Sequence, residues 1–68
     1  MSARIENGVI VLFDQTALRG KIMILHNGEI IGFHSTCFQS TPPTRFPRLG
    51  DMVTITFFDD KLVIVHSA

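Results

Sequence analysis

The stretch Arg45-Phe46-Pro47-Arg48 places an aromatic ring between two arginines. A ring can stack on a nucleobase while guanidinium groups hold phosphates, and the prolines of this region stiffen the backbone that would present them. The sequence therefore indicates a contact with single-stranded nucleic acid. The alternative is that Phe46 turns inward and plugs the end of the fold.

Catalytic chemistry finds little support in the sequence. Cys37 follows His34 by three residues, but a Cys–His nucleophile needs a third group to orient it, and a lone cysteine in an apolar chain more often packs in the interior. The three histidines and Cys37 have neither C-x-x-C nor H-x-x-x-H spacing, and no glycine-rich phosphate loop is present. Asp59-Asp60 indicates a hairpin turn. We expect a protein that is not an enzyme and uses no metal or cofactor.

Size and composition limit the fold to one small domain over residues 1–68. Hydrophobic residues form 46% of the chain and charged residues 18%, and the basic groups balance the acidic ones. Such a composition is typical of a folded globular domain. The apolar runs are far shorter than the ~20 residues that span a bilayer, so no membrane crossing is expected. Residues 1–6 contain an acid and no apolar core, unlike a secretory signal, and the expected location is the cytoplasm.

The composition favours an all-β fold, because the β-branched residues Ile, Val and Thr are abundant and Ala is rare. Asn27-Gly28 lies between two apolar runs and predicts a hairpin with a type I′ turn. Regular alternation is lost over residues 35–50, where three prolines leave room for at most one short helical turn near residues 35–38. The expected strands are residues 8–13, 18–26, 29–34, 51–58 and 61–66.

Five strands without covering helices are best accommodated by closure into a small barrel, which removes the sheet edges. An OB-type barrel and an SH3-like barrel are the two candidates. The long connection between the third and fourth strands favours a five-stranded antiparallel OB-type barrel.

Three segments resemble the bacterial cold-shock domain, an OB-type barrel that binds single-stranded RNA and DNA. Residues 8–13 (GVIVLF) are similar to its G-x-V-K-W-F, residues 29–35 (EIIGFHS) to its D-V-F-V-H-F-S, and residues 49–55 (LGDMVTI) to its E-G-Q-x-V-x-F. The family's K-G-F-G-F-I motif aligns with either residues 17–22 or residues 19–24. The resemblance covers residues 8–66 and implies the same barrel with a nucleic-acid-binding face.

The differences from the family lie on the face that it uses for base stacking. Leu12 stands at the tryptophan position, and the two phenylalanine positions of the second strand are Arg19 and Lys21, or else Lys21 and Met23. On the third strand, Phe33 and His34 stand where the family has His and Phe, and Phe33 points outward if Ile30 points inward. The alternative is that Phe33 packs in the barrel and His34 ends the strand. Base stacking contributes ~1–3 kcal/mol per base, so the loss of several rings predicts weak binding.

Two functions follow from this interpretation. The first is a small protein that binds single-stranded RNA or DNA. The second is a protein-interaction module, a homodimer or a binder of another protein, on a cold-shock-like barrel that has lost nucleic-acid binding. Aliphatic side chains at the family's stacking positions would form its contact patch. The nucleic-acid site would comprise Arg19, Lys21, Phe33, His34, Arg45, Phe46 and Arg48. The interaction patch would comprise Leu12, Met23 and Ile31.

Overall fold

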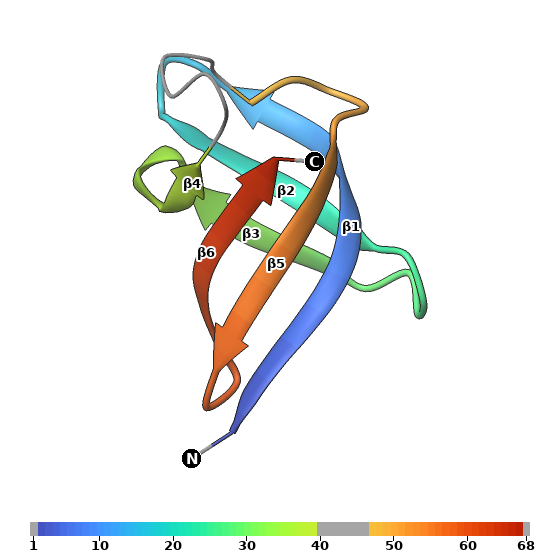
Figure 1. Cartoon of the computed structure of the whole chain (residues 1–68). Helices are drawn as coiled ribbons and strands as arrows, with labels where there is room; N and C mark the ends of the chain where they lie inside the picture. The colour runs from blue at the N-terminus through green and yellow to red at the C-terminus, as the bar shows by residue number, and fades with distance from the viewer. Residues whose placement is uncertain (1, 40–46, 68) are drawn as a thin grey trace.

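A computed structural model describes residues 2–39 and 47–67 of the chain, and in them the protein is an all-β fold (Figure 1). One sheet curls into a half-barrel, and its strands follow the order β3-β2-β1-β5-β6-β4. The helical part is a single 3-10 turn, η1. The elements are β1 (Ala3–Asp14), β2 (Arg19–Ile24), β3 (Ile30–His34), η1 (Ser35–Cys37), β4 (Phe38–Gln39), β5 (Met52–Phe58) and β6 (Lys61–Ser67).

The described sheet has six strands where the sequence predicted five. The additional strand is β4, whose two residues pair in parallel with Val65 and His66 of β6. Two residues are too few to give an alternating pattern, which is why the sequence did not reveal this strand. The other pairings are antiparallel, as expected, and the predicted helical turn near residues 35–38 is confirmed by η1. No other helix occurs in residues 2–39 and 47–67, and none there could span a bilayer.

The hairpin between β2 and β3 forms where Asn27-Gly28 predicted it, but the turn type is different. Gly28 has a φ of 74° and donates its N–H to the carbonyl of Ile24, while Asn27 keeps a negative φ. The connection is a loop over residues 25–28, closed by the Ile24 N–H donating to Glu29. Asn27 contributes its side-chain oxygen, which accepts the N–H of Glu29 at 2.9 Å. The type I′ prediction for this turn is wrong.

The first strand begins earlier than predicted and contains a bulge. Residues 3–7 contain the charged Arg4 and Glu6 and lie outside the predicted strand, yet they pair fully with β5. In the pairing with β2, Ile10 is opposite Ile22 and Leu12 is opposite Lys21, so Val11 is an extra residue. A bulge of this kind reverses the alternation beyond it. It explains why Ile10 is buried and Leu12, two residues later, is 48% exposed.

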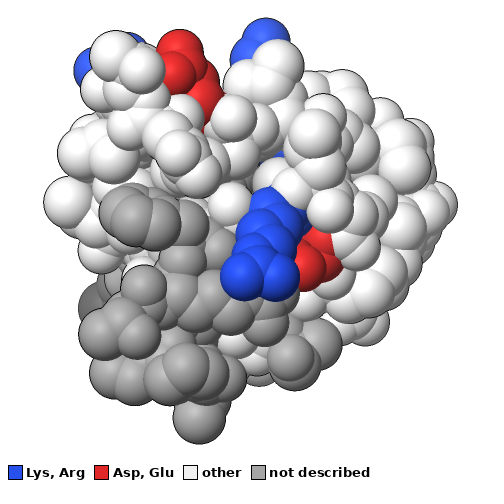
Figure 2. All heavy atoms as spheres, turned by 90° about the horizontal axis from the view of Figure 1, so that it is seen from above, with Lys and Arg blue, Asp and Glu red and all other residues white. Residues whose placement is uncertain are grey.

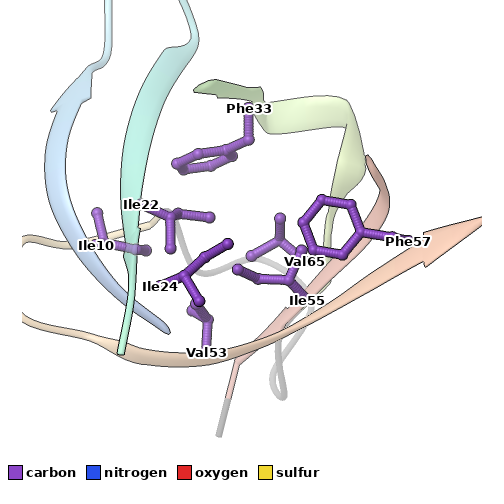
Figure 3. Packing of buried hydrophobic residues seen from close by; sticks show 8 residues of the cluster. All are labelled: Ile10, Ile22, Ile24, Phe33, Val53, Ile55, Phe57 and Val65. Carbon is purple, nitrogen blue, oxygen red and sulfur yellow. The ribbon is translucent and has the colours of Figure 1, made fainter. Parts of the chain in front are cut away.

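The core lies inside the curl of the sheet (Figure 3). Its members come from the inward-facing positions of β1, β2, β3, β5 and β6, and no charged or polar side chain is buried among the described residues. Phe13, Ile31, Phe38 and Leu62 pack around it. The buried members are Ile10, Ile22, Ile24, Phe33, Val53, Ile55, Phe57 and Val65.

Gly20 allows Phe33 to enter this core. A Cβ at residue 20 would lie 2.5 Å from the carbonyl oxygen of Leu12 and 2.7 Å from Cε1 of Phe33. Without that Cβ, the Phe33 ring lies directly against the backbone of β2. It also stacks on Phe13 with ring centroids 6.0 Å apart. The glycine is therefore required by close packing.

Candidate nucleic-acid interface

The convex, outward face of β2 and β3 carries the basic residues that the sequence singled out. Arg19 and Lys21 are both exposed on β2, which confirms that they share the outward face. The strand register places Arg19 opposite His34 and Lys21 opposite Gly32 on β3. Side chains directly opposite each other on one face of a sheet are near neighbours. Arg19, Lys21 and His34 thus form one cluster, here called the basic cluster.

An open hollow of about 430 Å³ lies at this cluster, lined by Arg19, Gly20, Lys21, Gly32, Phe33 and His34. Gly32 leaves its outer side empty, because the nearest heavy atom to a Cβ built there, the Gly20 carbonyl oxygen, is 3.9 Å away. A flat group could therefore approach the backbone of β3 between the basic side chains.

The cations of the basic cluster are available to a ligand. Within residues 2–39 and 47–67, neither Arg19 nor Lys21 takes part in an ion pair. Asp14 is opposite Arg19 on β1, but its Oδ1 accepts the backbone N–H groups of Thr16 and Ala17. The nearby acid is thus engaged with its own loop.

Arg4 shows the contrasting case of an arginine that is already used. Its guanidinium lies 3.4 Å from Glu6 and 3.6 Å from Asp60, and 4.5 Å from the centre of the Phe57 ring. Seen from above, the charged side chains stand singly or in small groups on a mainly uncharged surface (Figure 2). Any nucleic-acid contact would depend on a few local cations.

His34 is held in a defined orientation at the start of η1. Its Nδ1 accepts the backbone N–H of Thr36 at 3.2 Å and lies 3.1 Å from the Thr36 hydroxyl. An Nδ1 that accepts a hydrogen bond carries no proton, so the neutral ring has its proton on Nε2. The remaining ring nitrogen is then a hydrogen-bond donor for a phosphate or a base.

Two residues assigned to the outward face of β3 lie on the other side of the sheet. Phe33 is only 6% exposed and belongs to the core, and Ile31 packs against the core. The outward positions are Ile30, Gly32 and His34. The prediction that Phe33 points outward is wrong, and so is the outward placement of Ile31. Because Ile30, Ile31 and Phe33 are all apolar, hydrophobicity alone did not distinguish the two faces of this strand.

The loop predicted to stack a base is described only in part. Arg45 and Phe46 lie outside the described residues. Arg48 is exposed and begins a turn in which its N–H donates to Oδ2 of Asp51 and its carbonyl accepts the Asp51 N–H. It does not line the hollow beside the basic cluster. The stacking role of Phe46 stays a prediction.

An aliphatic row crosses the same outward face next to the basic cluster. Strand pairing aligns Met52, Val9, Met23 and Ile30 across four strands, and Met52 and Ile30 are each about half exposed. Leu12 is exposed on this outward face, as predicted, and Met23 is part of the row. Sequence reasoning missed Ile30 and Gly32. They would have been identified only if the outward-facing residues of β3 had been assigned correctly.

No group of three His, Cys, Asp or Glu side chains in residues 2–39 and 47–67 could hold a metal ion. Cys37 is a free, partly buried thiol in η1. The His34 ring uses Nδ1 to cap that turn. Searches against protein-family models, curated proteins and solved structures find no match for this chain.

Proposed function

We propose that this protein is a small non-enzymatic OB-type barrel that binds single-stranded RNA or DNA weakly through its basic cluster. The observation that carries the proposal is the hollow bordered by Arg19, Lys21 and His34, whose two cations have no ion pair within the described residues. Phosphates are the ligand class that such a cluster suits, and an open strand face accommodates an extended chain.

The order of the strands supports the OB-type assignment. Only the short turn η1 separates β3 from β4, so the two strands can be regarded as one broken strand. Five strands then remain, and the third pairs in parallel with the last while all other neighbours are antiparallel. A partly open barrel of five strands with one long connection is the arrangement expected of an OB-type fold.

Weak binding is expected because the described outward face of β2 and β3 has no phenylalanine, tyrosine or tryptophan ring. Each lost stacking contact removes ~1–3 kcal/mol, and the remaining attraction to phosphates is screened by salt. Affinity should therefore fall steeply as salt increases.

A titration of labelled oligothymidine and oligouridine, followed by fluorescence anisotropy at low and physiological salt, tests the proposal. Lys21→Gln should weaken binding and reduce the slope of log affinity against log salt by ~0.7–1. Lys61→Gln is the matched control, because it removes the same charge from an exposed position on β6. Wild-type protein that binds neither oligomer at low salt, or equal losses in both variants, would contradict a specific basic cluster.

A gain-of-function variant gives a second test. Leu12 is 48% exposed and opposite Lys21. Leu12→Trp should therefore place a stacking ring beside the cation and tighten binding by ~1–3 kcal/mol. Ile5→Trp, at a position 68% exposed on the distant half of β1, should have no such effect. An unchanged affinity for Leu12→Trp would mean that bases do not pass along this face.

Protein interaction is the second candidate, favoured by the aliphatic row of Met52, Val9, Met23 and Ile30. Partly exposed apolar side chains aligned across four strands, of which Met52 and Ile30 are about half exposed, are typical of a contact surface.

A further inference from the structure

We infer that the free edge of β3 is a self-pairing surface, through which two copies of this chain form a symmetric antiparallel dimer. This inference does not depend on nucleic-acid binding. Within the described residues, β3 pairs with β2 on one side only, and the pairing order places it at one end of the sheet (Figure 1). An unpaired strand edge presents backbone donors and acceptors that another strand can satisfy.

The backbone groups at this edge can be identified from the hydrogen bonds that flank β3. Ile24 donates to Glu29, and Ser35 donates to the carbonyl of Leu18, so both ends are in register with β2. In an antiparallel ladder, hydrogen-bonded pairs alternate with non-bonded pairs. Ile31 and Phe33 therefore bond toward β2. The N–H and C=O groups of Ile30, Gly32 and His34 point toward the free edge.

The β3 segment itself carries none of the sequence features that usually protect an edge strand. Natural edges carry charged side chains such as lysine, proline or bulges. The segment IIGFH of β3 contains neither lysine nor proline, and its register with β2 is regular. Ile30 is 50% exposed at one end, and Gly32 leaves space above the centre. A neighbouring strand could thus approach along the whole length of β3.

A second copy fits this edge with respect to both register and charge. A two-fold axis at Gly32 pairs Gly32 with Gly32 of the other copy, and Ile30 with His34. The basic cluster then lies beside the aliphatic Ile30 and Met23 of the other copy. The two Lys21 side chains are separated by three strand spacings, ~14 Å, which exceeds the screening length of ~8 Å at physiological salt. The net charge of zero adds no repulsion between copies.

The dimer should be reversible, because a short strand pairing lies at the small end of specific interfaces. Sedimentation equilibrium without nucleic acid, from micromolar to millimolar protein, should show the mass rising from monomer toward dimer. Ile30→Lys adds a charge at the edge and should keep the protein monomeric. Ile5→Lys, the same change at an exposed site on β1, should dimerise like the wild type. A monomeric wild type at millimolar concentration, or a dimer that persists in Ile30→Lys, overturns the inference.

Cysteine cross-linking tests the register, in a Cys37→Ser background. Gly32→Cys has space for its side chain. It would face itself across the two-fold axis, with Cα atoms ~5.5 Å apart, within disulfide range. Ile30→Cys would lie four residues out of register with its equivalent, ~13 Å away, beyond that range. Mild oxidation should therefore give disulfide-linked dimers for Gly32→Cys only. Absence of this product, or equal cross-linking of both variants, would contradict the proposed pairing.

Discussion

Two of the three hairpins in the described sheet, β5–β6 and β2–β3, are closed in different ways. Between β5 and β6, Asp59 and Asp60 form a two-residue turn with φ values of 51° and 63°, although neither is glycine. Between β2 and β3, Asn27-Gly28 belongs to a longer loop in which only Gly28 is left-handed. Asn27-Gly28, the dipeptide better suited to a type I′ turn, does not form one. Asp59-Asp60, which is less suited, adopts the positive φ values of a type I′ turn.

The difference reflects how firmly each hairpin is held by its neighbours. β5 pairs with β1 on its other side, and β6 pairs with β4. The register of β5 is thus fixed by β1 as well as by β6, and β4 adds a short pairing at the far end of β6. The connecting turn then accepts left-handed backbone, which aspartate tolerates better than most residues. In the described part of the chain, β3 is paired on one side only, so its loop is less constrained. Pairing context outweighs the preference of the turn dipeptide here.

The largest expected effect comes from Gly20→Ala in the β2–β3 hairpin. The new methyl group would clash with the Leu12 carbonyl and the Phe33 ring. We therefore expect destabilisation of about 3 kcal/mol, measured by urea unfolding. Gly32→Ala is the matched control on the open side of the same hairpin, and it should change stability by less than about 1 kcal/mol. Similar losses in both variants would contradict the packing of Phe33 against Gly20.

A smaller loss is expected at the left-handed residue of the same hairpin, Gly28. Gly28→Val should destabilise the protein by ~1–2 kcal/mol, because a β-branched residue resists a positive φ. Gly28→Asn, which accepts this conformation more easily, should cost less. Equal urea midpoints for wild type and Gly28→Val would mean that the loop can rearrange without a left-handed residue.

A gain in folding stability is expected from a substitution in the β5–β6 hairpin, where Asp60 has a positive φ. Asp60→Gly should stabilise the protein by about 1 kcal/mol, because glycine adopts this conformation without steric cost. The variant also removes the contact between Arg4 and Asp60, but Asp60 is 89% exposed. Surface pairs of this kind contribute little. A loss of stability in thermal unfolding would show that the Arg4 contact outweighs the backbone strain.

The sequence predicted β2 and β5 well because their residues differ between the two faces. In β5, Val53, Ile55 and Phe57 are buried while Thr54 and Thr56 are more exposed, as their alternation indicates. The same logic placed Arg19 and Lys21 outward on β2. Where polar and apolar residues alternate along a strand, the sequence alone shows which residues face the core and which face outward.

Prediction failed where both faces of a strand are apolar or where pairing is decided by distant residues. In β3, Ile30 and Ile31 gave no basis for choosing the inward face, and that choice misplaced Phe33. The decisive interaction is the fit of the Phe33 ring against Gly20, which depends on strand pairing. β4 likewise exists only through its contact with β6, a segment far away in the sequence.

The Val11 bulge also determines where β1 tolerates a change in chain length. Ile10 already faces inward and Leu12 already faces outward, so a deletion of Val11 would join two residues that alternate correctly. A deletion elsewhere in the strand would exchange the inner and outer faces of every residue between it and the bulge. The middle of β1 is therefore the position at which this strand can lose one residue and still present Leu12 and Asp14 to the outside.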